Sequence, residues 1–572
     1  MCLSTFRVLL RSLAVFPGLL LPCALPSHAQ PSDPDLQIRR QEQREQSLRR
    51  QAEPQAHVQS EMAQPSQEKL PTEESPCRDI QHIRLEGELA ARFAWALKAA
   101  NRDDDPAIGR CLGAQGIAAV MQRVQQSILA RGFVTTRVLA GSQDLRGGEL
   151  VLTLVPGRVR RLQLSEDSHA RARLHNAMPV DAGDLLDLRA LEQGLENLKR
   201  LPTADADMQI RPSEVPDAKP GDSDVVVRWQ QRLPYRLNLS VDDSGTEATG
   251  KYLGAVTFSY DHWWTLNDLF YLSYSDTLGG GSQGDRGNRS GTLHYSVPYR
   301  DWLIGFTASE FRFHQSVAGL NQTVRYSGEG STQDVALTRL LYRDGVRKTQ
   351  ATVRAWLRES HNFVGDAELT GQARRTAGWE ALIAHRERMA DGSLDTSIAW
   401  RRGTGAFGAQ HAPEEAFGEG SSRMQVARAD ALLSLPFAFI RHEWRYSLAW
   451  RAQWNNTPLT PQDRFVIGNR YTVRGFNGES LLSGDRGWLL RQDLGLSVSA
   501  IQSELYVGID TGEVGGRSTE GLVAQRLTGS VVGVRGGLGK LSWDAFVGKP
   551  IHKPDGYRTA STTAGFLFSL SL

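Results

Sequence analysis

The fold is decided by the stretch His442-Glu-Trp-Arg-Tyr-Ser-Leu-Ala-Trp-Arg-Ala-Gln-Trp454, in which apolar and polar residues alternate. Successive side chains of a strand point to opposite faces, so this segment has two unlike faces. One face carries Trp444, Tyr446, Leu448, Trp450, Ala452 and Trp454, and the other carries Arg445, Ser447, Ala449, Arg451 and Gln453. A soluble sandwich would bury one such face in a dry core, but aromatic ends on a repeated pattern fit lipid outside and water inside better.

The same two-residue period continues from Leu233 to the end of the chain, and it predicts a membrane β-barrel over residues 231–572. Gly- and Asp-rich stretches at 278–291 and 403–420 are predicted to be loops. Further strands are predicted at 235–241, 252–260, 293–299, 302–308, 490–498 and 541–547.

The overall composition narrows the class of protein. A chain of 572 residues suggests several domains, and a net charge of +2 with no basic face gives no reason to expect a nucleic-acid partner. Hydrophobic residues make up 40% of the chain, and no apolar run beyond the first 25 residues approaches the roughly 18 to 20 residues that a spanning helix needs. A membrane protein of this composition has to cross with strands.

The N-terminal region is predicted to contain a leader, a polar helix and a linker. Residues 1–29 carry Arg7 and Arg11, a short apolar run and small residues up to Ala29, which is typical of a cleaved secretory signal. Residues 30–53 begin with Asp33-Pro34, a helix start, but their few apolar residues cannot pack on a globular core. A disordered polar segment is the alternative. The Pro-rich residues 54–76 are predicted to be an extended linker.

Residues 77–230 are predicted to form two α+β units of the same order, strand, helix, helix, strand, strand, at 77–156 and 157–230. In the first unit the strands are expected at 80–85, 133–139 and 149–155, and the helices at 88–100 and 115–131. In the second unit the strands are expected at 159–164, 208–211 and 224–230, and the helices at 169–178 and 188–201.

Two cysteines remain after the leader. Cys2 and Cys23 lie within residues 1–29, so the mature chain keeps Cys77 and Cys111. An even pair in an oxidising compartment favours a disulfide, because two thiols without neighbouring His are too few for a metal site. We therefore predict a Cys77–Cys111 bond.

The motif Val473-Arg474-Gly475-Phe476 lies between two predicted membrane strands. An arginine there has to find an acceptor or lie in water, so it points to an interior loop. In the segment 505–511 apolar residues alternate with small or polar ones, so Asp510 shares the lumenal face with Gly508 and with the adjoining Gly512, whose small size leaves room for an inserted loop. We predict a charge-assisted pair between Arg474 and Asp510. The alternative is a solvated loop arginine and an ordinary lumenal carboxylate.

Together with Gly484-Asp485-Arg486-Gly487 and the segments 338–344 and 295–298, these motifs resemble the outer-membrane transporters of two-partner secretion, the hemolysin secretion and activation proteins of the ShlB, FhaC and HecB type. The likeness runs through essentially the whole mature chain. It implies an outer-membrane barrel of about 16 antiparallel strands, which agrees with about 340 residues at roughly 20 per strand and loop. The lumenal loop is expected at about 457–485. The segment 565–572 resembles the family's C-terminal recognition strand, although Leu572 is not aromatic.

The same resemblance implies the remaining roles. Residues 30–53 stand where the family has a plug helix in the pore, and the units at 77–156 and 157–230 resemble its polypeptide-transport-associated (POTRA) domains. These would lie in the periplasm of a Gram-negative bacterium and receive a secreted exoprotein of the TpsA type, with a sheet edge that could accept an extended client strand. Outer-membrane lipid and the barrel assembly machinery are the other implied partners.

No catalytic constellation is visible in the sequence. There is no nucleophile elbow, P-loop or His-Glu-x-x-His motif, so we expect neither catalytic residues, nor a cofactor, nor a metal site. His262 is interpreted as an interfacial or loop residue, and Asp103-Asp104-Asp105 as a solvated turn. The leading hypothesis is a translocase that secretes, with or without activating, an unfolded exoprotein of the hemolysin, adhesin or contact-dependent toxin type. The alternatives are an outer-membrane insertase, a passive porin and an outer-membrane enzyme.

Overall fold

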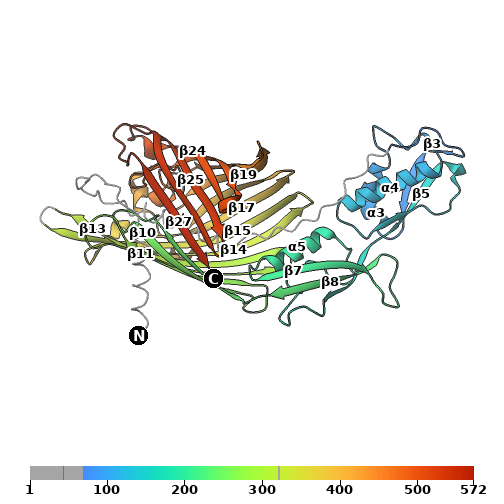
Figure 1. Ribbon diagram of the computed structural model, residues 1–572, viewed down its shortest axis with the longest axis horizontal. Coiled ribbons are helices and arrows are strands. Elements are labelled where there is room, and N and C mark those ends of the chain that lie inside the picture. Colours follow the sequence, from blue (N-terminus) through green and yellow to red (C-terminus); the bar gives the residue numbers. More distant parts are fainter. Residues whose placement is uncertain (1–42, 44–68, 320–321) are drawn as a thin grey trace.

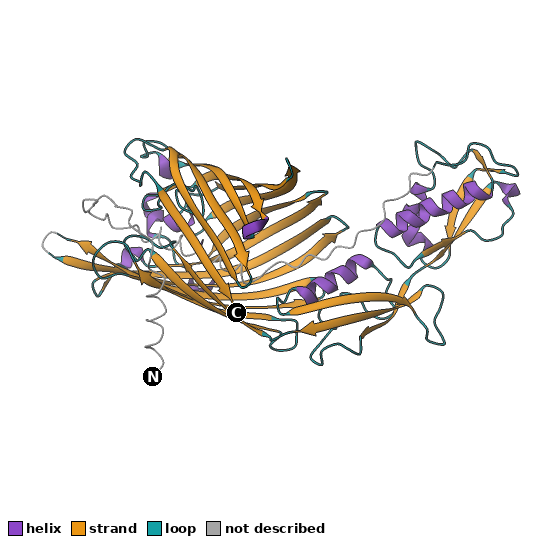
Figure 2. Cartoon of the chain, viewed as in Figure 1, coloured by secondary structure: helices purple, strands orange, loops and turns teal. Residues whose placement is uncertain are grey.

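The computed structural model describes residue 43 and residues 69–319 and 322–572 of the chain, and residues 30–53 otherwise lie outside the described part. Two small α+β domains follow one another and lead to a large barrel (Figures 1 and 2). No helix in the described ranges is long and apolar enough to cross a membrane.

The first domain packs helix α4 (Ala114–Ala130) on a three-stranded sheet of order β2-β5-β4, with β2 at His82–Glu86, β5 at Glu149–Val155 and β4 at Arg137–Leu139. β2 and β5 are parallel. The helical segment predicted at 88–100 divides into α3 (Ala90–Phe93) and the 3-10 helix η1 (Ala94–Ala99). The predicted strand at 133–139 is wrong in length, because Phe133 to Thr136 form a tight turn after Gly132.

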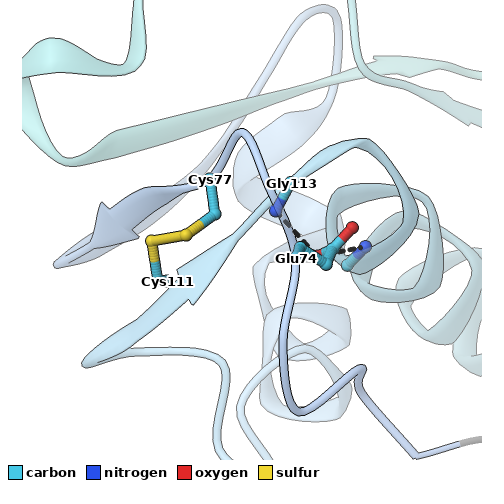
Figure 3. The surroundings of a disulfide bond; sticks show 5 residues. Glu74, Cys77, Cys111 and Gly113 are labelled. Carbon is cyan, nitrogen blue, oxygen red and sulfur yellow. Dashed lines mark hydrogen bonds between the residues drawn. A yellow bond between two sulfur atoms is a disulfide. The ribbon is translucent and has the colours of Figure 1, made fainter.

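A disulfide joins Cys77, which precedes the short strand β1 (Arg78–Ile80), to Cys111 within β3 (Arg110–Leu112), and the two strands pair with each other (Figure 3). Close by, the Glu74 carboxylate accepts hydrogen bonds from the amides of Gly113, Gln115 and Gly116 at 2.7, 2.9 and 3.0 Å. These amides open helix α4, which has no capping side chain of its own. The carboxylate therefore accepts hydrogen bonds from amides that have no acceptor within the helix. Its negative charge also interacts favourably with the positive end of the helix dipole.

The predicted solvated turn at 103–105 is wrong for Asp105. This carboxylate is buried, and it accepts hydrogen bonds from the Leu70 amide at 2.7 Å and from the Arg123 guanidinium. Arg110 lies 2.8 Å away. Burial alone would raise the pKa of Asp105, but these donors and charges lower it to about 2.

The second domain has a three-stranded sheet of order β6-β8-β7, with β6 at Arg158–Leu164, β8 at Asp222–Gln231 and β7 at Ala204–Pro212, covered by helix α5 (Leu188–Lys199). Its core gathers around Trp229, Leu191, Leu198 and Met178. The helix predicted at 169–178 is wrong, because these residues form turns. Their polar groups bind the barrel instead: Asn176 donates to Leu266 and Pro298, and Arg171 to His262. Tertiary contacts override local helical preference here.

The barrel is closed and antiparallel, and within the described residues it has sixteen long strands. The two-residue β16 (Ala367–Glu368) adds only to the end of β15. The long strands are β9 Tyr235–Asp242, β10 Tyr252–Asp261, β11 Leu269–Gly279, β12 Gly287–Tyr299, β13 Trp302–Ala318, β14 Thr323–Arg343, β15 Arg347–Val364, β17 Arg374–Met389, β18 Gly392–Thr404, β19 Gln425–Phe439, β20 His442–Asn455, β23 Arg486–Val498, β24 Ser503–Gly515, β25 Arg526–Leu538, β26 Leu541–His552 and β27 Thr563–Ser571. The predicted loop at 278–291 is too long, because β11 and β12 extend into it.

Short 3-10 helices complete the described elements: η2 Leu145–Gly147, η3 Thr370–Gln372, η4 Ala406–Gly408, η5 Pro413–Phe417, η6 Pro461–Asp463, η7 Ser499–Ile501 and η8 Arg517–Thr519.

The two faces of the barrel differ as the alternation predicts. Side chains of one set are exposed and apolar, including Val256, Phe258, Leu272, Ile304, Val335, Val353, Ile383, Ile398, Val507, Ile509, Val532 and Val547. The opposite face carries buried hydroxyls that bond across strands, such as Thr257 with Ser273 at 2.9 Å and Ser275 with Ser290 at 2.8 Å. An apolar exterior and a polar interior are what a lipid environment with a wet lumen requires.

We predict that the mature protein has no free thiol until it is reduced, and that Cys77→Ser with Cys111→Ser destabilises the first domain. The bonded residues are 34 positions apart, and closing a loop of that size is expected to contribute roughly 3–4 kcal/mol by restricting the unfolded chain. Alkylation followed by mass spectrometry, with and without reductant, counts the thiols. Urea-dependent proteolysis of this domain in the intact chain measures the stability. Two thiols that react without reductant would contradict the prediction.

Candidate functional site

The predicted lumenal loop occupies residues 456–485, between β20 and β23, and folds back against the inner wall. It contains its own small sheet of β21 (Phe465–Ile467) and β22 (Leu482–Gly484). The turns at the other ends of the strands, near Asn267, Arg300 and Arg343, touch the second α+β domain. The loop therefore enters from the barrel mouth that is opposite to that domain.

The structure brings Arg474 and Asp510 together. The Arg474 amide and Nε donate to Asp510 Oδ2 at 2.9 and 2.7 Å, and Nη2 donates to Oδ1 at 2.8 Å. Arg474 is 3% exposed and Asp510 is fully buried. A planar guanidinium that meets a carboxylate along two parallel hydrogen bonds forms a strong and directional pair.

Further charges balance this pair. Arg474 Nη2 also donates to Asp493 Oδ1 at 2.5 Å, and Arg535 contacts both Asp493, at 3.4 Å, and Glu504. Arg491 lies 3.7 Å from Asp510. Arg445 of β20 lies 3.4 Å from Glu504, so the cluster holds four guanidinium groups and three carboxylates on β20, β23, β24, β25 and the loop. A buried charge is tolerated when opposite charges and hydrogen bonds surround it, and removing one member is costly.

Glycines on the wall make room for the loop, as predicted for Gly508 and Gly512. A Cβ at Gly508 would lie 2.9 Å from Arg474 Nη2, and one at Gly512 would lie 3.0 Å from Val473 Cγ2. Gly475 has a φ of +93°, and its Cβ would lie 2.6 Å from the Lys549 carbonyl oxygen. Sequence reasoning missed Gly529, where a Cβ would collide with the Arg474 carbonyl.

An apolar cluster holds the rest of the motif. Val473 and Phe476 are buried with Ile467, Leu482, Leu489, Val514 and Leu527. The Phe476 ring meets Tyr557 edge-on at 5.7 Å, and the Tyr557 hydroxyl donates to the Ser480 carbonyl. All four motif residues therefore contact the wall or the core beside it.

Asp485 anchors the end of the loop, a role that the sequence did not reveal. Its carboxylate accepts hydrogen bonds from the amides of Ser518 at 3.0 Å and Leu459 at 3.3 Å. Only Gln43 is described in the predicted plug region. It is helical, and its Oε1 accepts a hydrogen bond of 3.0 Å from Asn469 of the loop. No cluster of three or more His, Cys, Asp or Glu side chains suited to a metal ion occurs in the described ranges.

A second set of residues, also missed from the sequence, joins the second domain to the barrel. His262 is fully buried in the turn between β10 and β11. Its Nδ1 accepts from the Asn267 amide at 3.0 Å, so the ring proton sits on Nε2, which faces the Arg171 carbonyl at 2.9 Å. The interpretation of His262 as a loop residue is confirmed, and its structural role in the joint is what the sequence did not predict.

Charged groups hold the other side of the joint. Arg343, at the end of β14, is 4% exposed and donates to Gln193 at 3.1 Å and Glu196 at 2.8 Å of helix α5. Lys348 pairs with Glu196 as well. Burial raises the pKa of Glu196, but the Lys348 and Arg343 charges outweigh burial and lower it. The segment 338–344 therefore contains Arg343, which ties the barrel to the domain.

A closed barrel with an apolar exterior, a loop held in its lumen and two α+β domains in tandem, the second docked on one mouth, define an outer-membrane transporter. Residues 221–536 match the family described as haemolysin secretion/activation protein ShlB/FhaC/HecB, residues 79–157 its ShlB-type POTRA domain, and residues 158–212 a POTRA domain. The chain belongs to this family. It lies in the outer membrane of a Gram-negative bacterium, with the POTRA domains in the periplasm.

Relatives agree in sequence and in fold. Outer membrane transporter CdiB-2 of Burkholderia pseudomallei (strain 1026b) is 35% identical over 464 residues, which cover 80% of this chain and 78% of the relative. Hemolysin transporter protein HpmB of Proteus mirabilis is 25% identical over 421 residues, 72% of each chain. The solved structure of CdiB from Acinetobacter baumannii has a TM-score of 0.83 at 30% identity and covers 96% of this chain and 100% of its own.

We predict that Gly475→Ala loosens the loop, because the new methyl group would collide with the Lys549 carbonyl and the φ of +93° is unfavourable for alanine. A strained backbone of this kind costs on the order of 1–3 kcal/mol. Protease cleavage within 456–485 of the folded, membrane-inserted protein measures the loosening. Gly521→Ala is the control, since nothing lies near its Cβ position. Equal cleavage of both variants would contradict the prediction.

The joint at His262 is predicted to weaken in acid. Burial lowers the pKa of His262 below 6.5. The hydrogen bond to the Arg171 carbonyl and the Asp268 charge favour protonation, and the Arg171 and Arg173 charges oppose it. The docked state therefore keeps its full stability above the pKa of the free imidazole, about 6.5, and loses it as the pH falls toward the lower pKa of the docked state. Spin-label distances between the second POTRA domain and the barrel measure docking from pH 8 to pH 5. His262→Gln keeps an acceptor and a donor but does not titrate, so its distances should not change.

Proposed function

We propose that this chain exports one dedicated, unfolded exoprotein across the outer membrane through the lumen of its barrel. The observation that carries the proposal is the Arg474 loop. It lies in the lumen of a closed barrel, yet side chains and not a strand ladder attach it to the wall. A seat of this kind can release the loop without breaking the barrel, so the lumen can alternate between a sealed state and an open one.

The periplasmic side fits the capture of an unfolded client. Strand β7 lies at the edge of its sheet and is nine residues long, which suits the addition of an extended client strand. The second POTRA domain is docked on the barrel mouth through His262 and Arg343, so a client held there is delivered beside the lumen. The contact of Gln43 with Asn469 supports a resting plug formed by residues 30–53.

The exoprotein is proposed to be of the hemolysin, adhesin or contact-dependent toxin type, because the relatives are named as CdiB and hemolysin transporters. Folding of the client outside the cell is the proposed driving force. An insertase is the second candidate, but the names of these relatives favour export. Activation of the client is tested in the same experiment, by assaying the activity of the secreted protein as well as its amount.

The test is to express the chain in a Gram-negative host with the large exoprotein encoded beside it, and to measure that exoprotein in the medium. Secretion that requires this chain is the expected result. No dependence on the chain, with the barrel verified in the outer membrane, would favour the insertase.

Arg474→Ala is expected to reduce secretion by at least about tenfold while the barrel still inserts, because removing one partner of a buried ion pair costs roughly 3–5 kcal/mol. Arg474→Lys should restore little, since an ammonium cannot make the two parallel hydrogen bonds to Asp510. Arg526→Ala is the control, because it breaks an exposed ion pair with Glu513 that joins β25 to β24, the strand that carries Asp510. Undiminished secretion by Arg474→Ala would contradict a role of the Arg474–Asp510 pair in export.

A further inference from the structure

The barrel closes where its first strand, β9, meets its last, β27, and this seam has the shortest ladder of the described barrel. Residues 238–242 pair in register with residues 567–571, whereas every other pair of neighbouring long strands is in register over at least eight residues. β27 begins at Thr563, so its first residues have β26 on one side and no ladder partner from β9 on the other.

The ladder ends in side-chain bonds at the position that follows Leu567 and Asp242. The Phe566 amide donates to Asp243 Oδ1 at 2.8 Å and not to a carbonyl of β9. The Asp243 amide is 3.4 Å from the Phe566 carbonyl oxygen. A carboxylate has thus replaced the backbone acceptor, and a backbone carbonyl is left with room for another donor.

That donor comes from the lumenal loop. Arg470 Nη1 donates to the Phe566 carbonyl at 3.0 Å and pairs with Asp243, so one guanidinium contacts both strands of the seam. Its side chain is 17% exposed and that of Asp243 is 9% exposed. A second loop residue, Glu479, accepts a hydrogen bond of 3.1 Å from the Glu247 amide in the connection between β9 and β10.

Arg470 and Arg474 are four residues apart, yet their side chains bind different strands of the barrel. Arg474 is fixed to Asp510 and Asp493 on β24 and β23, and Arg470 is fixed to β9 and β27. The Arg470 guanidinium can reach Asp243 and Phe566 only while the loop is seated. Unseating the loop therefore removes the Arg470 bonds to the seam beyond Leu567 and leaves only the direct bonds between Phe566 and Asp243 there.

We infer that Arg470 is a positioning residue that couples the seating of the lumenal loop to closure of the β9–β27 seam. The seated loop adds the Arg470 bonds at the extracellular end of the seam. The displaced loop leaves the seam held by its short ladder and by the direct bonds that flank this ladder, between Phe566 and Asp243 and between Leu237 and Leu572. This coupling is a property of the barrel and does not rest on the identity of the exported protein, so a failure of the secretion experiment leaves it standing.

The test measures the strength of the seam without any client. The purified mature protein in detergent is heated, and the temperature at which the compact band is lost on an unboiled gel is recorded. Arg470→Ala should lower this temperature by several degrees. Arg451→Ala, which breaks a lumenal ion pair with Asp430 across the long β19–β20 ladder, should not change it. Asp243→Asn should give a smaller shift, since it keeps an acceptor for the Phe566 amide. It serves as the second variant if Arg470→Ala does not assemble.

A disulfide across the seam tests whether the Arg470→Ala shift arises from opening of the β9–β27 ladder. Ser240 and Ser569 are in register across the seam, both are buried, and neither hydroxyl has a hydrogen-bond partner among the described residues. Facing residues of antiparallel strands lie about 4.5–5.5 Å apart, which suits a disulfide. Ser240→Cys with Ser569→Cys, oxidised, should abolish the shift caused by Arg470→Ala, and reduction should bring it back.

The coupling itself is tested by the double variant. Arg474→Ala, which unseats the loop, should also weaken the seam, and Arg470→Ala with Arg474→Ala should be no weaker than the more affected single variant. An Arg470→Ala shift that matches Arg451→Ala, a shift that persists in the locked seam, or effects that add in the double variant would each overturn the proposal.

Discussion

Every backbone amide and carbonyl of a segment in lipid has to find a partner within the protein, and this constraint governs the whole C-terminal part of the chain. Sixteen strands satisfy it by closing on themselves, because an open edge would leave a row of unpaired groups. Closure depends on the contact between the first and last strands of the barrel, and this contact is the shortest of the ladders between long strands. The seam joins strands far apart in sequence, and its ladder is short enough that Asp243 and Arg470 are needed to continue it.

The lumen sets a different constraint. It is polar, so a loop placed there finds little apolar surface on which to pack. The chain solves this with two kinds of contact. An apolar cluster around Val473 and Phe476 excludes water locally, and a balanced set of charges around Arg474 provides direction. The wall glycines make both possible, because any side chain at Gly508 or Gly529 would occupy the space of the loop.

The sequence predicts the barrel well because alternation is local: the faces of 442–454 and 505–511 follow from the two-residue period alone. It also indicates a partnership between Arg474 and Asp510, because an arginine inside a barrel needs an acceptor. It does not predict the joint, since His262 and Asn176 become important only when turns from distant parts of the chain meet. The same contacts explain why residues 169–178 are not helical. Arg470 is missed for a similar reason, because its partners Asp243 and Phe566 adjoin it only after closure.

The distribution of contacts also indicates which part can move. The two POTRA domains meet closely, since Gly157 donates to Thr136 at 3.0 Å and a Cβ at Gly157 would collide with Thr135. The second domain is fixed to the barrel by the buried groups around His262 and Arg343. Hydrogen-bonded ladders between neighbouring strands hold the barrel wall together. The loop at 456–485 lies in the lumen itself, and side chains rather than a strand ladder attach it to the wall. Motion that opens the lumen should therefore begin in the loop, and the seam should follow because Arg470 belongs to both.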